Sequence, residues 1–193
     1  MLQLAIFASG SGSNAENIIR YFRHSGIARV HSVYCNNPNA GVFERAKKLS
    51  VAANLFSRKD FFDDESVNIK LIDEKIDFII LAGFLWKVPA SLIKLFDGRI
   101  VNIHPALLPD FGGKGFYGEK VHQSVIDSGT PVSGITIHHV NEHFDAGEII
   151  FQAACHVEKS ETASSLAGKI HDLEYRYFPV VIEKLVARLA NKA

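Results

Sequence analysis

Two polar side chains stand two residues apart in the stretch NIHPALLP, residues 102–109. If this stretch begins on a β-strand, Asn102 and His104 project from the same side of it. The Asn amide can donate a hydrogen bond to an oxygen that becomes negative during a reaction, and His can act as an acid or base near neutral pH. These residue types suit a reaction that passes through an oxyanion.

A second chemically active segment, HHVNEHFDAG, covers residues 138–147. Asp145 lies in a predicted loop closed by Gly147, and from there it could reach His104. A carboxylate at that place would stabilise the imidazolium and raise the pKa of His104. The alternative makes Asp145 a turn residue that hydrogen-bonds only its own backbone. On the first interpretation, Asn102, His104 and Asp145 form one catalytic set.

The same segment is rich enough in His and acidic residues to suggest a metal site. On a strand, however, His138 and His139 face opposite sides of the sheet and cannot both bind one ion. The H-E-x-x-H spacing of zinc proteases does not occur in the sequence. We therefore expect no bound metal.

A glycine-rich stretch, FASGSGSNA, residues 7–15, matches the G-x-G-x-x-G/A fingerprint through Gly10, Gly12 and Ala15. Glycines allow a tight turn, and the free N–H groups at a helix start attract an anion. An NAD site would need an Asp or Glu at the end of the second strand, but residues 33–38 read VYCNNP. No Walker Lys-Ser/Thr pair follows the stretch. It favours a site for a single phosphate, with an unliganded strand-to-helix turn as the alternative.

These segments have to be positioned by the elements around them. Short apolar runs alternate with segments of helical period, which indicates an α/β fold with a doubly wound, mostly parallel sheet. The run FIIL at 78–81 has no polar alternation, as expected of a strand covered on both faces. The predicted strands are Leu2–Phe7, Val30–Tyr34, Ala52–Leu55, Phe78–Leu81 and Ile100–Ile103, and the predicted helices are Ala15–His24, Gly41–Leu49, Asp63–Lys75 and Pro89–Phe96.

The pattern changes in the second half of the chain. The predicted elements there are helix Glu119–Ser128, strands Val132–Val140 and Glu148–Val157 joined by 141–147, and helix Thr162–Leu189. The two strands form an antiparallel C-terminal hairpin, and Pro179 predicts a kink or break in the last helix. Residues 105–118 are the one long connection without periodicity, and loops of that length are often functional.

Ligands of open α/β sheets bind at the carboxyl ends of the strands. Gly10–Asn14 follows the first predicted strand, Gly83–Val88 follows the fourth, and His104 follows the fifth. Three chemically unusual segments therefore point to one edge of the sheet, and we expect a single site there.

Length and composition restrict the class of protein. With 193 residues, 47% of them hydrophobic and 22% charged, one globular domain over 1–193 is expected. The formal net charge is zero, so no global field favours nucleic acid or an anionic membrane as a partner. Cys35 and Cys155 suit a reducing compartment without a disulfide, and the start MLQLAIFASG lacks the basic region of a signal peptide. We expect a cytoplasmic protein without a membrane segment, as a monomer or a homodimer.

The chain resembles the phosphoribosylglycinamide formyltransferases, a branch of the folate-dependent formyltransferases. The motifs that carry the resemblance are GSGSN at 10–14, LAGF at 81–84, NIHPALLP at 102–109 and the segment 138–147. The resemblance implies a Rossmann-like formyltransferase fold, with a phosphate-binding half, 1–100, and a catalytic and folate-binding half, 101–193. It also implies transfer of the formyl group of the co-substrate 10-formyltetrahydrofolate to the amine of 5'-phosphoribosylglycinamide, in de novo purine biosynthesis.

The resemblance further implies a role for each matching residue. Catalysis would fall to Asn102, His104 and Asp145, the substrate phosphate to Gly12, Ser13 and Asn14, and the ribose hydroxyls to Glu174. The folate would lie against Leu85, Trp86, Lys87, Val88, Asn141, Glu142, His143, Phe144 and Asp145. For Glu174 alone, the sequence leaves an exposed helix acid as the alternative.

Two features depart from the family pattern. The loop DFGGKGFYG, residues 110–118, is longer and richer in glycine than the common form. Some relatives use an arginine after the third strand to meet the glutamate tail of the folate, and here Arg58 and Lys59 lie near that place without a clear match. Two other functions remain as alternatives. A hydrolase of the same folate needs no phosphate site, and a non-catalytic sensor of a phosphate ligand has no use for an Asn–His–Asp set.

Overall fold

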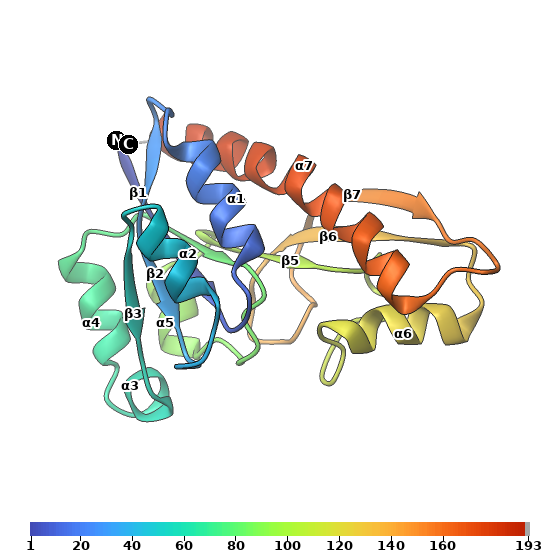
Figure 1. Cartoon of the computed structure of the whole chain (residues 1–193). Coiled ribbons are helices and arrows are strands. Elements are labelled where there is room, and N and C mark those ends of the chain that lie inside the picture. Colours follow the sequence, from blue (N-terminus) through green and yellow to red (C-terminus); the bar gives the residue numbers. More distant parts are fainter. Residues whose placement is uncertain (192–193) are drawn as a thin grey trace.

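One seven-stranded sheet runs through the molecule, and helices cover both of its faces (Figure 1). The structure is a computed structural model that describes residues 1–191. The strands are β1 (Leu2–Ala8), β2 (Ala28–Cys35), β3 (Ala52–Leu55), β4 (Phe78–Leu81), β5 (Ile100–His104), β6 (Val132–His139) and β7 (Ile149–His156). Their order is β3-β2-β1-β4-β5-β6-β7. The first five are parallel, whereas β6 is antiparallel to both β5 and β7. The predicted α/β class and the antiparallel hairpin are confirmed.

The helices agree closely with the predicted segments, with one exception near residue 60. They are α1 (Ser13–Phe22), α2 (Val42–Lys48), α3 (Arg58–Phe62), α4 (Ser66–Asp73), α5 (Ala90–Leu95), α6 (Glu119–Ser128) and α7 (Ala163–Ala190). The helix expected over 63–75 begins only at Ser66, and the short α3 was not predicted. At the start of α3, the Ser57 hydroxyl accepts from the Asp60 N–H while the Asp60 carboxylate accepts from the Ser57 N–H. This capping box stabilises a helix too short to show an apolar period.

The last helix continues through Pro179, so the predicted break is wrong. Proline removes one backbone hydrogen bond from a helix interior, which destabilises an isolated helix. Here Phe178 and Ile182, on either side of it, are fully buried in the main core. Tertiary packing therefore holds α7 together at this point.

Alternate residues of β1 pack into opposite layers of the molecule. Leu4 and Ile6 belong to a core formed with α1, α2, α6 and α7, whereas Ala5 and Phe7 belong to a second core with α3, α4 and α5. All four side chains are fully buried. A central strand covered on both faces holds the glycine-rich turn at its carboxyl end in a fixed position.

The connection from β5 to α6, residues 105–118, contains no helix or strand, as predicted. Thr136 on β6 holds its first part, because the Thr136 hydroxyl donates to the Ala106 carbonyl at 2.7 Å and accepts from the Leu108 N–H at 2.9 Å. The remainder of the connection reaches the carboxyl edge of the sheet. Among the described helices, none combines the length and the apolar character needed to span a membrane.

Candidate active site

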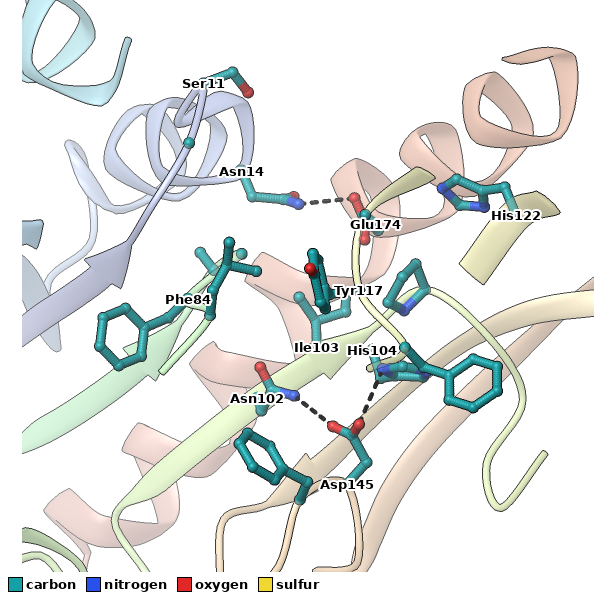
Figure 2. Close-up of a pocket in the computed structure, with 18 of the residues that line it drawn as sticks. Ser11, Asn14, Phe84, Asn102, Ile103, His104, Tyr117, His122, Asp145 and Glu174 are labelled. Atoms are coloured by element: carbon teal, nitrogen blue, oxygen red, sulfur yellow. Dashed lines mark hydrogen bonds and ion pairs between the residues drawn. The ribbon is translucent and has the colours of Figure 1, made fainter. Parts of the chain in front are cut away.

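A cavity of about 530 Å³ opens at the carboxyl edge of the parallel strands (Figure 2). Its walls come from the turn after β1, the segment after β4, the end of β5, the connection 113–118, the loop before β7, and the helices α6 and α7. Of the residues singled out in the sequence, the cavity brings together Gly12, Ser13, Asn14, Leu85, Asn102, His104, Phe144, Asp145 and Glu174. Segments that are distant in the chain thus meet in one space.

Gly12 is the turn residue that starts α1. Its φ of 78° lies in the left-handed region, and a Cβ built there would approach Val42 Cγ2 to 2.5 Å and Val42 Cα to 2.7 Å. Glycine is therefore required by the packing of α1 against α2 as well as by the turn. No side chain caps the first N–H groups of α1. Because Gly10–Asn14 lines the cavity, this helix start offers a place for an anion.

Asn14 and Glu174 join the first and last helices across the cavity (Figure 2). The Asn14 amide donates to Glu174 Oε2 at 2.8 Å, and Glu174 is only 6% exposed. Burial raises the pKa of Glu174, although Asn14 and His171 partly oppose that shift. Among the described residues, Asn14 Oδ1 is buried without a hydrogen-bond partner. Glu174 is thus not an exposed helix acid, and the pair retains acceptor capacity for a ligand with hydroxyl groups.

Asn102 on β5 is oriented by the neighbouring strand. His138 Nδ1 donates to the His139 carbonyl at 2.8 Å, so in the neutral ring His138 Nε2 is left as an acceptor. The Asn102 amide nitrogen donates to that atom at 3.1 Å and lies 3.5 Å from Asp145 Oδ1. The amide hydrogen that points toward Asp145 makes the longer contact of the two. It is therefore the one that Asn102 can most easily donate to a substrate oxygen.

His104 is held in one tautomer by the long connection. Its Nε2 lies 2.8 Å from the Phe111 carbonyl, which can only accept, so Nε2 carries the hydrogen. Nδ1 lies 3.6 Å from Asp145 Oδ2 (Figure 2). Burial of the 3% exposed ring lowers the pKa of His104 and outweighs Asp145 and the Phe111 carbonyl, which raise it. Asp145 thus raises the pKa of His104 as expected, but the net shift is downward, because burial of the ring is the larger effect.

Asp145 takes part in more than its own turn. Its φ of 52° places it in the left-handed region, and its Oδ2 accepts from the Gly113 N–H at 2.9 Å. Burial alone would raise the pKa of Asp145, but His104 and the Gly113 amide help to hold it below the usual value. Asp145 is thus an ionised carboxylate next to Nδ1 of His104. The interpretation in which it bonds only its own backbone is wrong.

A smaller cavity of about 60 Å³ adjoins the first one and shares Phe84, Asn102, Phe144 and Asp145 with it. Of the residues expected to meet the folate, it contains Trp86, Lys87, Val88, Asn141, His143, Phe144 and Asp145. Glu142 lies apart from both cavities, in a hollow with Lys94 and Asp97. Its place outside both cavities does not support the expected role.

Two histidines play a part in the site that was not predicted from the sequence. His138 is the direct cross-strand partner of Asn102 in the β5–β6 register, which a correct pairing of the predicted strands would have indicated. His122 on α6 lines the cavity and is buried, and desolvation lowers its pKa. Among the described residues, no cluster of three or more His, Cys, Asp or Glu side chains could hold a metal ion.

Comparison with known proteins shows which sequences and folds are similar to this chain. The chain matches the family described as Formyl transferase over residues 2–182. It belongs to the formyl transferase family. The resemblance to the formyltransferases that the motifs indicated is thereby confirmed, and it extends over nearly all of the described residues.

Individual relatives agree with that assignment. The chain is 38% identical over 191 residues to the chloroplastic phosphoribosylglycinamide formyltransferase of Vigna unguiculata, an alignment that covers 95% of this formyl transferase but only 60% of the plant protein. It is 33% identical over 191 residues to the phosphoribosylglycinamide formyltransferase of Bacillus subtilis (strain 168), covering 96% of this chain and 95% of that one. The crystal structure of phosphoribosylglycinamide formyltransferase from Streptococcus pneumoniae TIGR4 superposes with a TM-score of 0.85 at 34% identity, covering 96% of this chain and 99% of that one.

Proposed function

We propose that this formyl transferase moves the formyl group of 10-formyltetrahydrofolate to the amine of 5'-phosphoribosylglycinamide, a step of de novo purine biosynthesis. One observation carries the proposal. A single cavity joins an uncapped helix start, which suits a phosphate, to an Asn–His–Asp set with a buried imidazole, which suits an oxyanion. The names of the relatives from Vigna unguiculata and Bacillus subtilis support this choice of substrate.

The ribonucleotide would extend from α1 toward the end of β5. Its phosphate would take the N–H groups of Gly12, Ser13 and Asn14, and its ribose hydroxyls would donate to Glu174. That direction brings the glycinamide amine toward Asn102. The buried and unpartnered Asn14 Oδ1 supports this placement, because an unpaired buried acceptor gains a partner when hydroxyl groups bind.

The folate would lie across the boundary of the two cavities. Its flat ring suits the apolar wall made by Trp86, Val88 and Phe144, and the backbone of 141–145 offers polar groups at the edge. About 60 Å³ is too little for a two-ring system. We therefore expect the Phe144 side chain, which is 40% exposed and borders both cavities, to move when the folate binds.

The chemical step needs a place for one charge and a path for one proton. The amine attacks the formyl carbon, the carbonyl oxygen becomes negative, and the C–N10 bond of the folate then breaks. Asn102 would stabilise that oxygen, and so would His104 once its Nδ1 has taken the proton that the amine loses, each donor contributing about 3 kcal/mol. Asp145 would favour this proton on Nδ1 and, through a water, help pass it on to N10. No net proton is consumed.

The two alternatives lack the same support. A hydrolase would use water in place of the amine and would leave the uncapped start of α1 and the Asn14–Glu174 pair without a task. A sensor would leave the Asn102–His104–Asp145 set without a task. The two free cysteines, Cys35 and Cys155, are compatible with the cytoplasm, which we propose as the compartment. The assembly state, monomer or homodimer, stays a prediction.

An assay of folate product distinguishes the three functions. The purified chain is incubated with 10-formyltetrahydrofolate, with and without 5'-phosphoribosylglycinamide, and tetrahydrofolate formation is measured. We expect product only when the ribonucleotide is present, together with the formylated ribonucleotide in equal amount. Product without the ribonucleotide would indicate the hydrolase, and binding of the ribonucleotide without any product would indicate the sensor.

A further inference from the structure

A tight turn in the glycine-rich connection holds one lysine at the cavity. The Phe116 N–H donates to the Gly113 carbonyl at 3.2 Å, so residues 113–116 form a β-turn with Lys114 at its second position. Gly115 follows with a φ of 101°, and a positive φ at the third position is what a type II turn requires. Lys114 is therefore placed by the backbone of the turn.

The base of this turn is fixed to the catalytic side chains. The Gly113 N–H donates to Asp145 Oδ2 at 2.9 Å, and the Phe111 carbonyl accepts from His104 Nε2 at 2.8 Å. Both contacts lie within three residues of Lys114. The lysine thus has a defined starting point at the edge of the cavity, while its exposed side chain can still turn inward.

The charges around the cavity show why a cation matters there. Among the described residues that line it, Lys114 is the one Lys or Arg, and Asp145 and Glu174 are the carboxylates. Burial lowers the pKa of His104 and that of His122 below the ordinary 6.5. Both rings are therefore neutral at a pH above 6.5. A phosphate dianion would thus enter a space with a single permanent positive charge.

Two arginines near the glycine-rich turn do not bring a second positive charge into the cavity. Arg45 donates to the Ser11 carbonyl at 2.9 Å and pairs with the Glu16 carboxylate, and Arg20 pairs with the same carboxylate at 2.7 Å. Neither arginine lines the cavity. Their charge is largely balanced where they stand, so the helix start and Lys114 are left to compensate a dianion.

We propose that Lys114 is a phosphate-binding residue that pairs, from the long connection, with the phosphate held at the start of α1. This inference rests on the proposed function, because it takes a phosphate monoester as substrate. A lysine suits the task, since its ammonium is a point charge on a flexible stem and can approach a phosphate from several directions. The long glycine-rich loop thereby gains a role in recognising the substrate's anionic end.

The test compares substrates with and without the phosphate. The substitutions are Lys114→Ala, Lys114→Arg and, as a matched control, Lys120→Ala. The ammonium of Lys120 lies over the Tyr117 ring, and Lys120 does not line the cavity. With Lys114→Ala, we expect the KM for 5'-phosphoribosylglycinamide to rise about tenfold, the usual effect of losing a charged hydrogen bond. The KM for the folate and kcat should change less than about twofold, and Lys114→Arg should restore most of the loss.

The dephosphorylated ribonucleoside serves as the decisive probe. Wild type and Lys114→Ala should use it equally poorly, because the lysine has no phosphate to meet. The inference is overturned if Lys114→Ala leaves the ribonucleotide KM unchanged, if it raises the folate KM instead, or if it impairs the ribonucleoside as much as the ribonucleotide. Failure of the proposed function itself would be visible separately, as wild-type enzyme that forms no ribonucleotide-dependent product.

Discussion

Asp145→Asn tests the electrostatic link between the carboxylate and His104, because it removes the charge and keeps the shape of the side chain. The charge lies 3.6 Å from His104 Nδ1, and the two residues are mostly shielded from solvent. At an effective dielectric constant of about 20, two unit charges about 4 Å apart attract by about 4 kcal/mol. That value corresponds to an upper limit of about three pKa units. Measured shifts from one opposite charge run from about one unit upward.

The expected direction follows from the present balance at His104. Burial already lowers its pKa below the ordinary 6.5, and Asp145 opposes burial. Without the carboxylate, the pKa of His104 should fall further, by about one unit or more. Since the proposed reaction needs a proton on Nδ1 when the oxyanion forms, kcat should fall by about two orders of magnitude or more.

NMR titration of the imidazole resonances measures this pKa directly, and the ¹⁵N shifts also report whether Nε2 carries the hydrogen. Asp110→Asn, an exposed change in the same connection, is the matched control and should leave the His104 pKa where it is. An unchanged or higher His104 pKa in Asp145→Asn would refute the electrostatic reasoning, even if activity were lost. A neutral ring with the hydrogen on Nδ1 would refute the tautomer derived from the Phe111 carbonyl.

Three further changes test separate parts of the structure. Gly12→Ala should lower Tm because its Cβ meets Val42 at a φ of 78°, whereas Gly10→Ala, with no atom within 4 Å, should not; equal Tm values would contradict this. Glu174→Gln should raise the ribonucleotide KM about tenfold and spare the folate KM, and an unchanged ribonucleotide KM would remove Glu174 from the ribose site. Burial lowers the pKa of His122, so protonation favours the unfolded chain, and the free energy of unfolding should fall as the pH drops below 6.5. Denaturant titrations at several pH values measure this free energy for wild type and for His122→Asn. It should depend less on pH in the variant, and an equal pH dependence would contradict the effect of burial on His122.

The strands were predictable because their apolar runs are set by burial on both faces. The run FIIL became β4 with the predicted limits, and the alternation of Leu4 and Ile6 with Ala5 and Phe7 divides the two cores. The short helix α3 was missed because five residues carry no helical period. Its signal was the Ser57–Asp60 capping pattern, which depends on residue types at two positions rather than on periodicity.

The site was predictable as far as side chains identify it. Asn102, His104 and Asp145 have distinctive chemistry, and their place at strand ends follows from the order of elements. The sign of the His104 pKa shift was not accessible, because desolvation and a nearby carboxylate act in opposite directions and only the packing decides which is larger.

Backbone groups limit in a different way what can be predicted of the site from the sequence. The tautomer of His104 depends on the Phe111 carbonyl, and the orientation of Asp145 depends on the Gly113 N–H. Since nearly every residue carries the same two backbone groups, no residue type in the sequence marks these two. They become specific only because the long connection folds back onto the end of β5. The glycine-rich loop 110–118 therefore orients the catalytic side chains, and a change in its length would act on His104 and Asp145 without replacing either.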